Sequence, residues 1–242
     1  MTEDTNSPVA RVVLVTGGNR GIGLAIASAF KEQGDTVVVS HRSGEAPEGL
    51  HGVHMDVTDS ESVSTAFKDV ESRFGTVDIL VANAGITKDG LSLRMSESDF
   101  QDVVNTNLTG AFRTAQKSLS GMMKKKKGRV IFIGSVVGLL GSSGQVNYAS
   151  TKSGLVGMAR SFAREYGSRN ITFNVIAPGF VETDMTSVLS DELRDKYVSQ
   201  IPLGRFCTPE EVAGVATFLA SNEAAYITGA VIPVDGGLGM GH

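Results

Sequence analysis

Apolar and polar positions change along the chain in a regular pattern of short strands and longer helices. Short apolar runs predict seven strands, at residues 11–16, 36–40, 52–55, 77–82, from 131 to just before 135, 171–177 and 230–233. Between them, apolar residues recur at helical spacing over 21–33, from 59 or 60 to 75, from 96 to the basic run at 124–127, 147–166, 191–200 and 209–220. Strands that alternate with helices are typical of a doubly wound α/β fold. We therefore expect a Rossmann-like sheet of seven mostly parallel strands with helices on both faces, in a single domain.

Length and composition agree with one folded domain. The chain has 242 residues, of which 41% are hydrophobic, and its 29 glycines fit many tight turns between strands and helices. This much apolar material can bury a substantial core, which excludes a disordered chain. Residues 1–10 are polar and lack the apolar core of a signal peptide. We expect them to form a flexible tail before a domain at 11–242.

Charge and special residues exclude several classes of protein. The net charge of −4 argues against general nucleic-acid binding. The uncharged stretch 130–151 is interrupted by glycines, serines, Gln145 and Asn147, so we expect no membrane span. The single cysteine, Cys207, excludes an internal disulfide, and we interpret it as a packing residue of a cytoplasmic protein. No metal site is expected, because the histidines are scattered, at His41, His51, His54 and His242.

The stretch 131–164 carries the first candidate chemistry. It reads as a strand, a Gly/Ser-rich turn and a helix, and Tyr148 and Lys152 lie four residues apart on that helix. Their side chains therefore leave the same face, about 5–6 Å apart, and the ammonium is expected to lower the pKa of the phenol. Ser135, just past the strand, offers a hydroxyl to the same space. The alternatives are a surface tyrosine that packs on a lysine stem and a serine that only forms a turn.

A glycine-rich turn follows the first strand. Residues 16–23 read TGGNRGIG between an apolar strand and a helical run, so the backbone can turn tightly and approach a pyrophosphate at the helix N-terminus. The spacing departs from G-x-G-x-x-G, yet the context favours a nucleotide site over a flexible turn. At the end of the second strand, residues 40–42 hold no acid for a ribose 2′-hydroxyl. Arg42 and Arg20 favour NADPH over NADH, the alternative being that both arginines are simply solvated.

Together with further residues, these two motifs resemble the short-chain dehydrogenase/reductase family over essentially the whole chain. The matching residues are Thr16, Gly17, Gly21 and Gly23 of T-G-x-x-x-G-x-G, Asp56, Val57, Asn83, Ala84, Gly85, Asn107, Ser135, Tyr148, Lys152, Pro178, Gly179 and Thr183. The resemblance implies cofactor contacts from Thr16, Gly17, Asn19, Arg20, Gly21, Ile22, Gly23, Arg42, Asp56, Val57, Asn83, Ala84, Gly85, Tyr148, Lys152, Pro178, Gly179, Val181 and Thr183. From its context, Asp56 could equally be a turn or cap residue.

The resemblance also implies a reaction. The passages most similar to those of the 3-oxoacyl-[acyl-carrier-protein] reductases are 107–110, 178–185 and 234–237. In such a reductase Tyr148 donates a proton to the substrate carbonyl, Lys152 lowers the pKa of Tyr148 and binds the nicotinamide ribose, and Ser135 stabilises the developing alkoxide. Asn107 distorts its helix and orders a water beside the lysine. The implied cofactor is NADP(H), the implied partner is an acyl carrier protein that carries the 3-oxoacyl thioester, and the implied assembly is a homotetramer.

Three further expectations concern surfaces. The polar segment at about 182–206 is a candidate substrate lid. The helix 147–166 has more apolar surface than one sheet face requires, which favours pairing of helices between subunits; the residues concerned are Leu155, Met158, Ala159 and Phe162. Lys124–Lys127, Arg129 and Arg169 form either a solvated helix end or a docking surface for an acidic carrier protein.

Two other functions are compatible with the sequence. Another short-chain dehydrogenase, acting on a sugar, a steroid or a small alcohol, would keep every catalytic residue and differ at 91–95 and in the lid. A non-catalytic NADP-binding sensor would have no need for the full set of Asn107, Ser135, Tyr148 and Lys152, and is the less favoured alternative.

Overall fold

One parallel sheet forms the centre of the computed structural model, which describes residues 10–187 and 190–240. The strand order is β3-β2-β1-β4-β5-β6-β7, and each strand pairs in parallel with its neighbours. The strands are β1 (Val12–Thr16), β2 (Thr36–His41), β3 (His51–His54), β4 (Ile79–Ala82), β5 (Gly128–Ile133), β6 (Ile171–Pro178) and β7 (Val231–Val234). The sheet confirms the predicted doubly wound fold, and its named strands are all parallel, where the prediction was mostly parallel.

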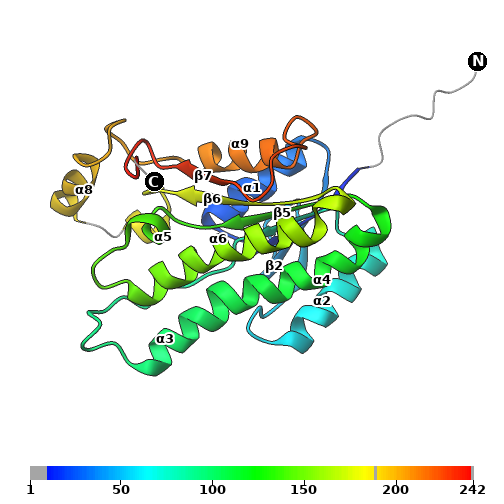
Figure 1. Ribbon diagram of the computed structural model, residues 1–242, viewed down its shortest axis with the longest axis horizontal. Coiled ribbons are helices and arrows are strands. Elements are labelled where there is room, and N and C mark those ends of the chain that lie inside the picture. Colours follow the sequence, from blue (N-terminus) through cyan, green and yellow to red (C-terminus); the bar gives the residue numbers. More distant parts are fainter. Residues whose placement is uncertain (1–9, 188–189, 241–242) are drawn as a thin grey trace, which may run out of the picture.

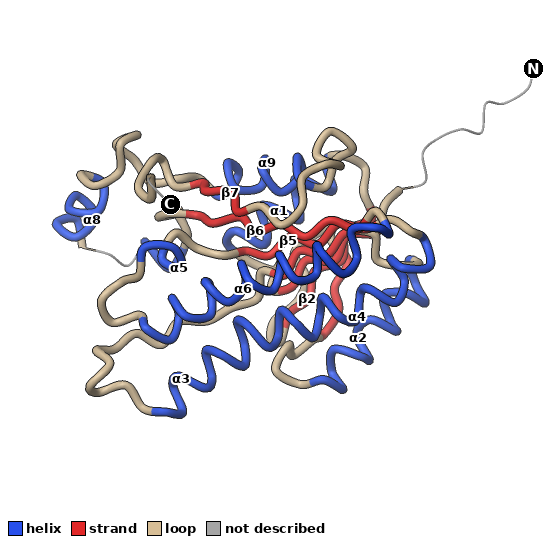
Figure 2. Tube along the Cα trace, in the orientation of Figure 1, coloured by secondary structure: helices blue, strands red, loops and turns tan. Residues whose placement is uncertain are grey.

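Helices cover both faces of the sheet (Figures 1 and 2). They are α1 (Gly21–Glu32), α2 (Ser60–Phe74), α3 (Glu97–Val103), the π-helical segment η1 (Val104–Thr109), α4 (Gly110–Lys125), α5 (Val137–Leu140), α6 (Val146–Tyr166), the 3₁₀ turn η2 (Gly167–Arg169), α7 (Asp184–Ser187), α8 (Asp191–Val198) and α9 (Pro209–Leu219). Helices α1 and α9 pack together over one face, where Ile26, Phe30 and Val212 are buried. Helices α2, α4 and α6 cover the other face, where Phe67, Leu119 and Leu155 are buried.

Each central strand supplies side chains to both cores. In β1, Val13 and Val15 join the core beneath α1 and α9, whereas Val12 and Leu14 join the core beneath α2, α4 and α6. Successive residues of a strand point to opposite faces, so a strand that is covered on both sides needs an unbroken apolar run. This is the physical reason for the continuous apolar runs in the sequence.

Capping residues fix several helix ends where the sequence predicts them. Asp59 caps α2 by accepting a hydrogen bond from Glu61 N at 2.9 Å, and Gly75 follows the helix with φ 93°. Thr208 and Glu211 form a capping box at the start of α9. These interactions are local, which is why the sequence reveals them.

The end of α4 does not use the glycine that follows the basic run. Lys126, with φ 51°, takes the left-handed conformation after the helix, and Gly128 is the first residue of β5. An added Cβ at Gly128 would lie 2.5 Å from the sulfur of Met122. Gly128 is therefore needed for the close packing of α4 on β5 and does not end the helix.

The single helix predicted from Ser96 is divided by a π-helical segment. Ser96 caps α3 by accepting a hydrogen bond from Asp99 N at 3.0 Å, but the turns widen over Val104–Thr109 before α4 begins. Such π segments are rare and are frequently found at functional sites. This one contains Asn107, so the predicted distortion of the helix at that residue is confirmed.

Two further predictions concern the N-terminal tail and a membrane span. Residues 1–9 of the predicted flexible tail lie outside the described residues. None of the helices in the described part of the chain has both the length and the apolar character needed to cross a membrane.

Candidate active site

The carboxyl ends of four neighbouring strands meet at one edge of the sheet. Strands β1 and β4 are neighbours although β2 and β3 come between them in sequence, so the winding of the chain reverses there. Open α/β sheets bind ligands in the crevice at such a switch point. Residues 17–23 follow β1, residues 83–85 follow β4, Ser135 follows β5 and Gly179 follows β6. The fold thus brings the predicted motifs to a single edge.

Close packing and backbone geometry both require the glycines after β1. Gly17 and Gly21 have φ of 60° and 54°, values that residues with a side chain rarely adopt. An added Cβ at Gly23 would lie 2.5 Å from Nδ2 of Asn83. Among the described residues, no side chain caps the start of α1, and its first turn contains no acid. The free N–H groups and positive dipole end of α1 fit a pyrophosphate, with Asn19 and Ile22 in the same turn.

Thr16 and Asn83 hold the glycine turn against the end of β4. The buried Thr16 hydroxyl accepts hydrogen bonds from the N–H groups of Asn83 and Ala84, both at 2.9 Å. The Asn83 amide donates to the carbonyls of Thr16 and Gly17, both at 3.0 Å. The side chains of these two predicted cofactor residues are therefore occupied in shaping the floor of the site.

The ends of β2 and β3 carry the residues predicted to contact the adenosine part of a cofactor. Oδ1 of Asp56 accepts from the N–H and the hydroxyl of Thr58, at 2.8 and 2.6 Å. These bonds hold the pKa of Asp56 below its ordinary value, and the charge of Arg42 acts in the same direction. Asp56 thus shapes the turn after β3, its contact with a cofactor stays a prediction, and Arg42 lies exposed nearby. Within residues 10–187 and 190–240, neither Arg42 nor Arg20 forms an ion pair, so both cations are available to a phosphate.

Val57 and Gly85, two further predicted cofactor residues, differ in their exposure to solvent. Val57 is buried beneath α4, where an added Cβ at Gly110 would lie 2.8 Å from its side chain. Gly85 is exposed at the surface of the crevice. A hollow of about 450 Å³ beside them is lined in part by Arg42, Thr58 and Lys88. The Val57 side chain therefore packs against α4, and its contact with a cofactor stays a prediction.

Lys152 is buried on α6 and is anchored by the sheet. Its ammonium donates to the carbonyl of Ile133, the last residue of β5, at 2.7 Å. Only 5% of Lys152 is exposed, and this loss of hydration lowers the pKa of its ammonium to about 8. Gly138 of α5 allows the approach, since a Cβ there would lie 2.8 Å from the main chain of Lys152.

The Tyr148 phenol has a pKa above its ordinary value, so the predicted lowering by Lys152 is wrong for this structure. Burial of the phenol is the largest cause, the negative charge of Asp89 raises the pKa further, and a hydrogen bond with Ser135 lowers it. Ser135 Oγ accepts from Val137 N at 3.2 Å, which leaves its proton for the phenol oxygen. The Lys152 ammonium lies 5.3 Å from the Tyr148 ring centroid, but it is directed to the Ile133 carbonyl.

Asn107 connects the π-helical segment to the loop after β4. The side chain is buried, its Oδ1 accepts from Ile86 N at 2.8 Å, and its Nδ2 donates to Ile86 O at 2.9 Å. The same Nδ2 lies 3.4 Å from the Thr151 hydroxyl on α6. Asn107 thus ties the loop to both helices, while its role in ordering a water stays a prediction.

The turn after β6 brings the start of the predicted lid to the glycine turn. Pro178 is the last residue of β6, and a Cβ at Gly179 would lie 2.9 Å from Cα of Asp235. Val181 is buried and forms a parallel bridge with Cys207. A Cβ built on Gly21 would lie 3.7 Å from Thr183, which places Thr183 beside the turn that fits the pyrophosphate.

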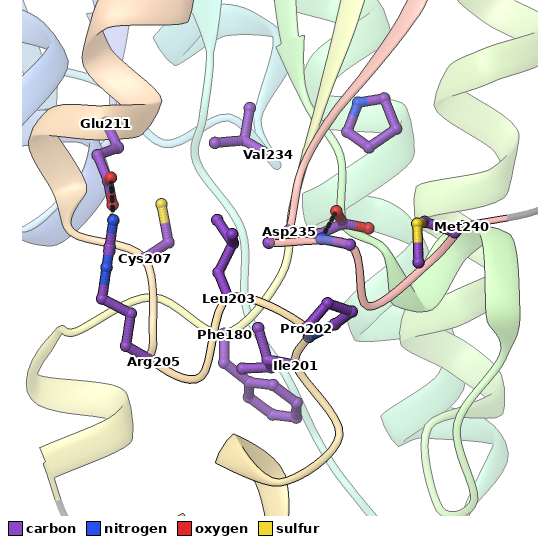
Figure 3. A pocket seen from close by; sticks show the side chains of 13 residues that line it. Phe180, Ile201, Pro202, Leu203, Arg205, Cys207, Glu211, Val234, Asp235 and Met240 are labelled. Carbon is purple, nitrogen blue, oxygen red and sulfur yellow. Dashed lines mark hydrogen bonds and ion pairs between the residues drawn. The ribbon is translucent and has the colours of Figure 1, made fainter.

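A second hollow, which no sequence motif predicted, lies beside the turn after β6. It has a volume of about 450 Å³ and lies between the segment that returns from α8 and the end of β7, as Figure 3 shows. Phe180 faces it and stacks on Tyr197 of α8 with ring centroids 4.3 Å apart. Burial raises the pKa of the half-buried Cys207 thiol to about 11, so the thiol keeps its proton at neutral pH, which agrees with the predicted packing role.

Two of the predicted surfaces change in the structure. Leu155, Ala159 and Phe162 are buried against the chain's own sheet, so they cannot be the surplus apolar surface that was predicted to favour subunit pairing. Arg129 is also buried, only 4% exposed, and its guanidinium donates to the carbonyls of Gly128 and Asn170. It therefore drops out of the basic surface, whereas Lys124 and Arg169 are exposed.

Among residues 10–187 and 190–240, no cluster of three or more His, Cys, Asp or Glu side chains could hold a metal ion.

Comparison with known proteins agrees with this site. A family model described as enoyl-(acyl carrier protein) reductase matches residues 17–239. The chain belongs to the short-chain dehydrogenase/reductase family, whose members are oxidoreductases that use a nicotinamide cofactor.

Several relatives in that family are similar over their full length. A protein named 3-oxoacyl-[acyl-carrier-protein] reductase MabA, from Mycobacterium tuberculosis, is 54% identical over 242 residues, 100% of this chain and 98% of the relative. Proteins named 3-oxoacyl-[acyl-carrier-protein] reductase FabG are 49% identical in Aquifex aeolicus (240 residues, 94% and 97% of the two chains) and 45% identical in Escherichia coli K12 (238 residues, 95% and 98%).

Proposed function

We propose that this chain is an NADPH-dependent 3-oxoacyl-[acyl-carrier-protein] reductase of fatty-acid elongation. The observation that carries the proposal is the arrangement of Ser135, Tyr148 and Lys152 at the strand edge that also holds the open N-terminus of α1. The similarity to proteins of that name supports the choice of substrate.

Tyr148 acts as the proton donor in the proposed reaction. Because its pKa is raised, the phenol keeps its proton at neutral pH and can give it to the carbonyl oxygen of the substrate. The O–H bond of Tyr148 breaks as the new O–H bond forms on that oxygen. Ser135 donates a hydrogen bond to the same oxygen and so stabilises the negative charge that develops there.

The cofactor would lie across the strand edge. When bound, NADPH supplies the hydride that the carbonyl carbon accepts. Residues 17–23 would hold the pyrophosphate, Arg42 and Arg20 the 2′-phosphate, and Lys152 the nicotinamide ribose.

The partner, the assembly and the compartment complete the proposal. An acyl carrier protein delivers the 3-oxoacyl thioester, and the segment 182–206 acts as the lid over it. The enzyme works in the cytoplasm.

Four copies of the chain form a homotetramer. The aromatic ring of Phe112 on α4 supports an assembly, because it is 39% exposed and lies 6.2 Å from the ring of Phe162 on α6. An exposed aromatic residue across two neighbouring helices fits a helix-pairing surface.

The experiment is a steady-state assay of NADPH oxidation across substrate classes. The panel contains 3-oxoacyl thioesters of increasing chain length, a trans-2-enoyl thioester, and a sugar, a steroid and a small ketone. We expect the highest kcat/KM on the 3-oxoacyl thioesters. A preference for the enoyl thioester or for another ketone would assign a different reductase, and binding of NADPH without turnover of any substrate would assign a sensor.

A further inference from the structure

The loop after β4 is fastened to the start of α6 at three places. Asn147 Nδ2 donates to Lys88 O at 2.9 Å, and Gln145 Nε2 donates to a carboxylate oxygen of Asp89 at 3.0 Å. A backbone hydrogen bond joins Gly90 N to Gly144 O at 2.8 Å. Residues 88–90 and 144–147 therefore run side by side, immediately before Tyr148 in the chain.

Asn147 is the buried member of this set and uses both ends of its amide. Its exposed fraction is 0%, and while Nδ2 bonds the loop, Oδ1 accepts from Tyr148 N at 2.7 Å. Tyr148 lies in the first turn of α6, where N–H groups lack a partner within the helix. The residue at the usual capping position, Gln145, makes no capping hydrogen bond. Asn147 thus satisfies an N–H that would otherwise be costly to bury.

The loop to which Asn147 is bonded is itself held in place. The Lys88 ammonium pairs with Asp99 and Asp102 of α3, both at 2.8 Å. The Asn107 amide holds Ile86, two residues earlier, through both its N–H and its carbonyl. Asn147 therefore ties the main chain of Tyr148 to a fixed neighbour.

The two ends of the catalytic pair are consequently held by different parts of the molecule. Lys152 is anchored by the Ile133 carbonyl of β5, whereas the N–H of Tyr148 is held by Asn147 and its carbonyl accepts from Thr151 Oγ1 at 2.7 Å. Removing the Asn147 amide would loosen Tyr148 without touching the anchor of Lys152. A displacement of about 1 Å at a reacting group can cost roughly 100-fold in rate.

We propose that Asn147 is a positioning residue that sets the place of the Tyr148 phenol by holding the first turn of α6 against the loop 86–90. It acts through the main chain of Tyr148 and does not contact the substrate. The inference rests on the proposed function, in which Tyr148 is the proton donor.

The test compares Asn147→Leu, which keeps the branched shape of the side chain but has no polar atoms, and Asn147→Asp, which keeps an acceptor for Tyr148 N but loses the donor to Lys88 O. Ser150→Ala is the matched control, because Ser150 is exposed on the next turn of α6 and its hydroxyl donates to Val146 O within the same helix, at 2.6 Å. We expect Asn147→Leu to lower kcat by about 10- to 100-fold, with the NADPH dissociation constant within about twofold of wild type. Asn147→Asp should fall between Asn147→Leu and wild type, and Ser150→Ala should match wild type.

A second readout does not depend on turnover. The phenolate absorbance of each protein is titrated against its own Tyr148→Phe counterpart, which isolates the signal of Tyr148. In Asn147→Leu, Ser135 and Asp89 are unchanged, so any shift of the Tyr148 pKa toward its ordinary value reports that the ring has left its buried place. We expect the Tyr148 pKa of Asn147→Leu to lie below that of wild type, closer to the ordinary value of a phenol.

The outcomes separate this inference from the proposed function. An Asn147→Leu protein with wild-type kcat and an unmoved Tyr148 titration would overturn it, as would a loss of kcat accompanied by an equal loss of NADPH binding. If wild type reduces no ketone at all, the proposed function fails, and the titration alone then decides whether Asn147 positions Tyr148.

Discussion

The ammonium of Lys152 bonds the carbonyl of Ile133 at 2.7 Å and lies 5.3 Å from the ring centroid of Tyr148. The lysine is thus fixed by the main chain of the sheet rather than by an acidic side chain. Its charge is buried with a single neutral partner among the described residues, which is why its pKa falls to about 8. This relationship leads to predictions for both residues.

Tyr148→Phe should keep NADPH affinity and lose turnover. The ring still packs, but the hydroxyl that gives the proton is gone, so kcat should fall by at least about 100-fold. Lys152→Ala should lower both cofactor affinity and turnover, because Lys152 is proposed to hold the nicotinamide ribose and so to place the hydride donor beside Tyr148. Fluorescence titration with NADPH and a steady-state assay check both variants, and a Tyr148→Phe enzyme with wild-type turnover would refute the assignment of the proton donor.

The stability difference between wild type and Lys152→Met should depend on pH. The pKa of Lys152 is about 8 in the folded chain and 10.5 ordinarily, so between these values the unfolded chain holds a proton that the folded chain lacks. The contribution of this site to the free energy of unfolding therefore rises with pH across that window, by roughly 3 kcal/mol in total. Urea unfolding of both proteins from pH 8 to 10.5 measures it. A difference that stays constant with pH would show that the ammonium is as well solvated in the fold as outside it.

Arg42→Asp should shift cofactor preference from NADPH toward NADH. Arg42 is exposed at the end of β2, and a carboxylate there repels a 2′-phosphate and accepts from a 2′-hydroxyl. The ratio of kcat/KM for the two cofactors should fall by about 10-fold or more, with Arg20→Ala producing a smaller change. If neither variant moves the ratio, another group reads the phosphate.

Reversing the exposed basic charges near the ends of α4 and α6 should lower activity on carrier-protein substrates but not on coenzyme A substrates. Lys124, Lys126 and Arg169 are all exposed. The ends of α4 and α6 lie close together, because Gly128 N donates to Asn170 O in the segments that follow the two helices. Replacing all three with glutamate should lower kcat/KM on a carrier-protein thioester, most strongly at low salt, and leave a coenzyme A thioester unaffected.

The control for that experiment replaces Lys31 and Lys68, which are exposed on α1 and α2, with glutamate. Equal losses on both thioesters, or the same loss in the control, would mean that the three charges do not dock the partner. The surface lies at the amino ends of the strands, opposite the site, so a docking role also requires that a neighbouring subunit bring it near a site entrance.

Light scattering should give a tetramer at micromolar protein. Phe112→Glu, at the exposed ring that packs on Phe162, should shift the mass toward smaller species because it places a charge in the proposed helix-pairing surface. A wild-type monomer under these conditions would contradict the proposed assembly.

Local signals explain what could be predicted from the sequence. The glycines at 17, 21 and 23 and the caps at Asp59 and Thr208 act within a few residues of themselves, and the apolar runs reflect strands buried on both faces. The positions of Ser135, Tyr148 and Lys152 then follow from the strand order of a doubly wound sheet.

Contacts between distant elements explain what could not be predicted. Gly128 looks like a helix terminator until Met122 is seen against it, and the pKa of Tyr148 depends on burial and on Asp89, which lies far away in sequence. Asn147 carries no motif of its own, and only its two hydrogen bonds distinguish it from an ordinary helix residue. Spacing reports which residues share a helix face, but not how deeply a neighbouring loop buries them.

The π-helical segment Val104–Thr109 restricts the number of residues between α3 and α4 as well as their identity. Each residue of an α-helix turns by about 100°, so the loss of one residue here would restore regular α-helical winding and rotate one flank against the other by about that angle. Either Asn107 would leave Ile86, or α4 would turn its buried face away from the sheet. Insertions and deletions between α3 and α4 should therefore be much rarer among functional variants of this chain than substitutions at the same positions.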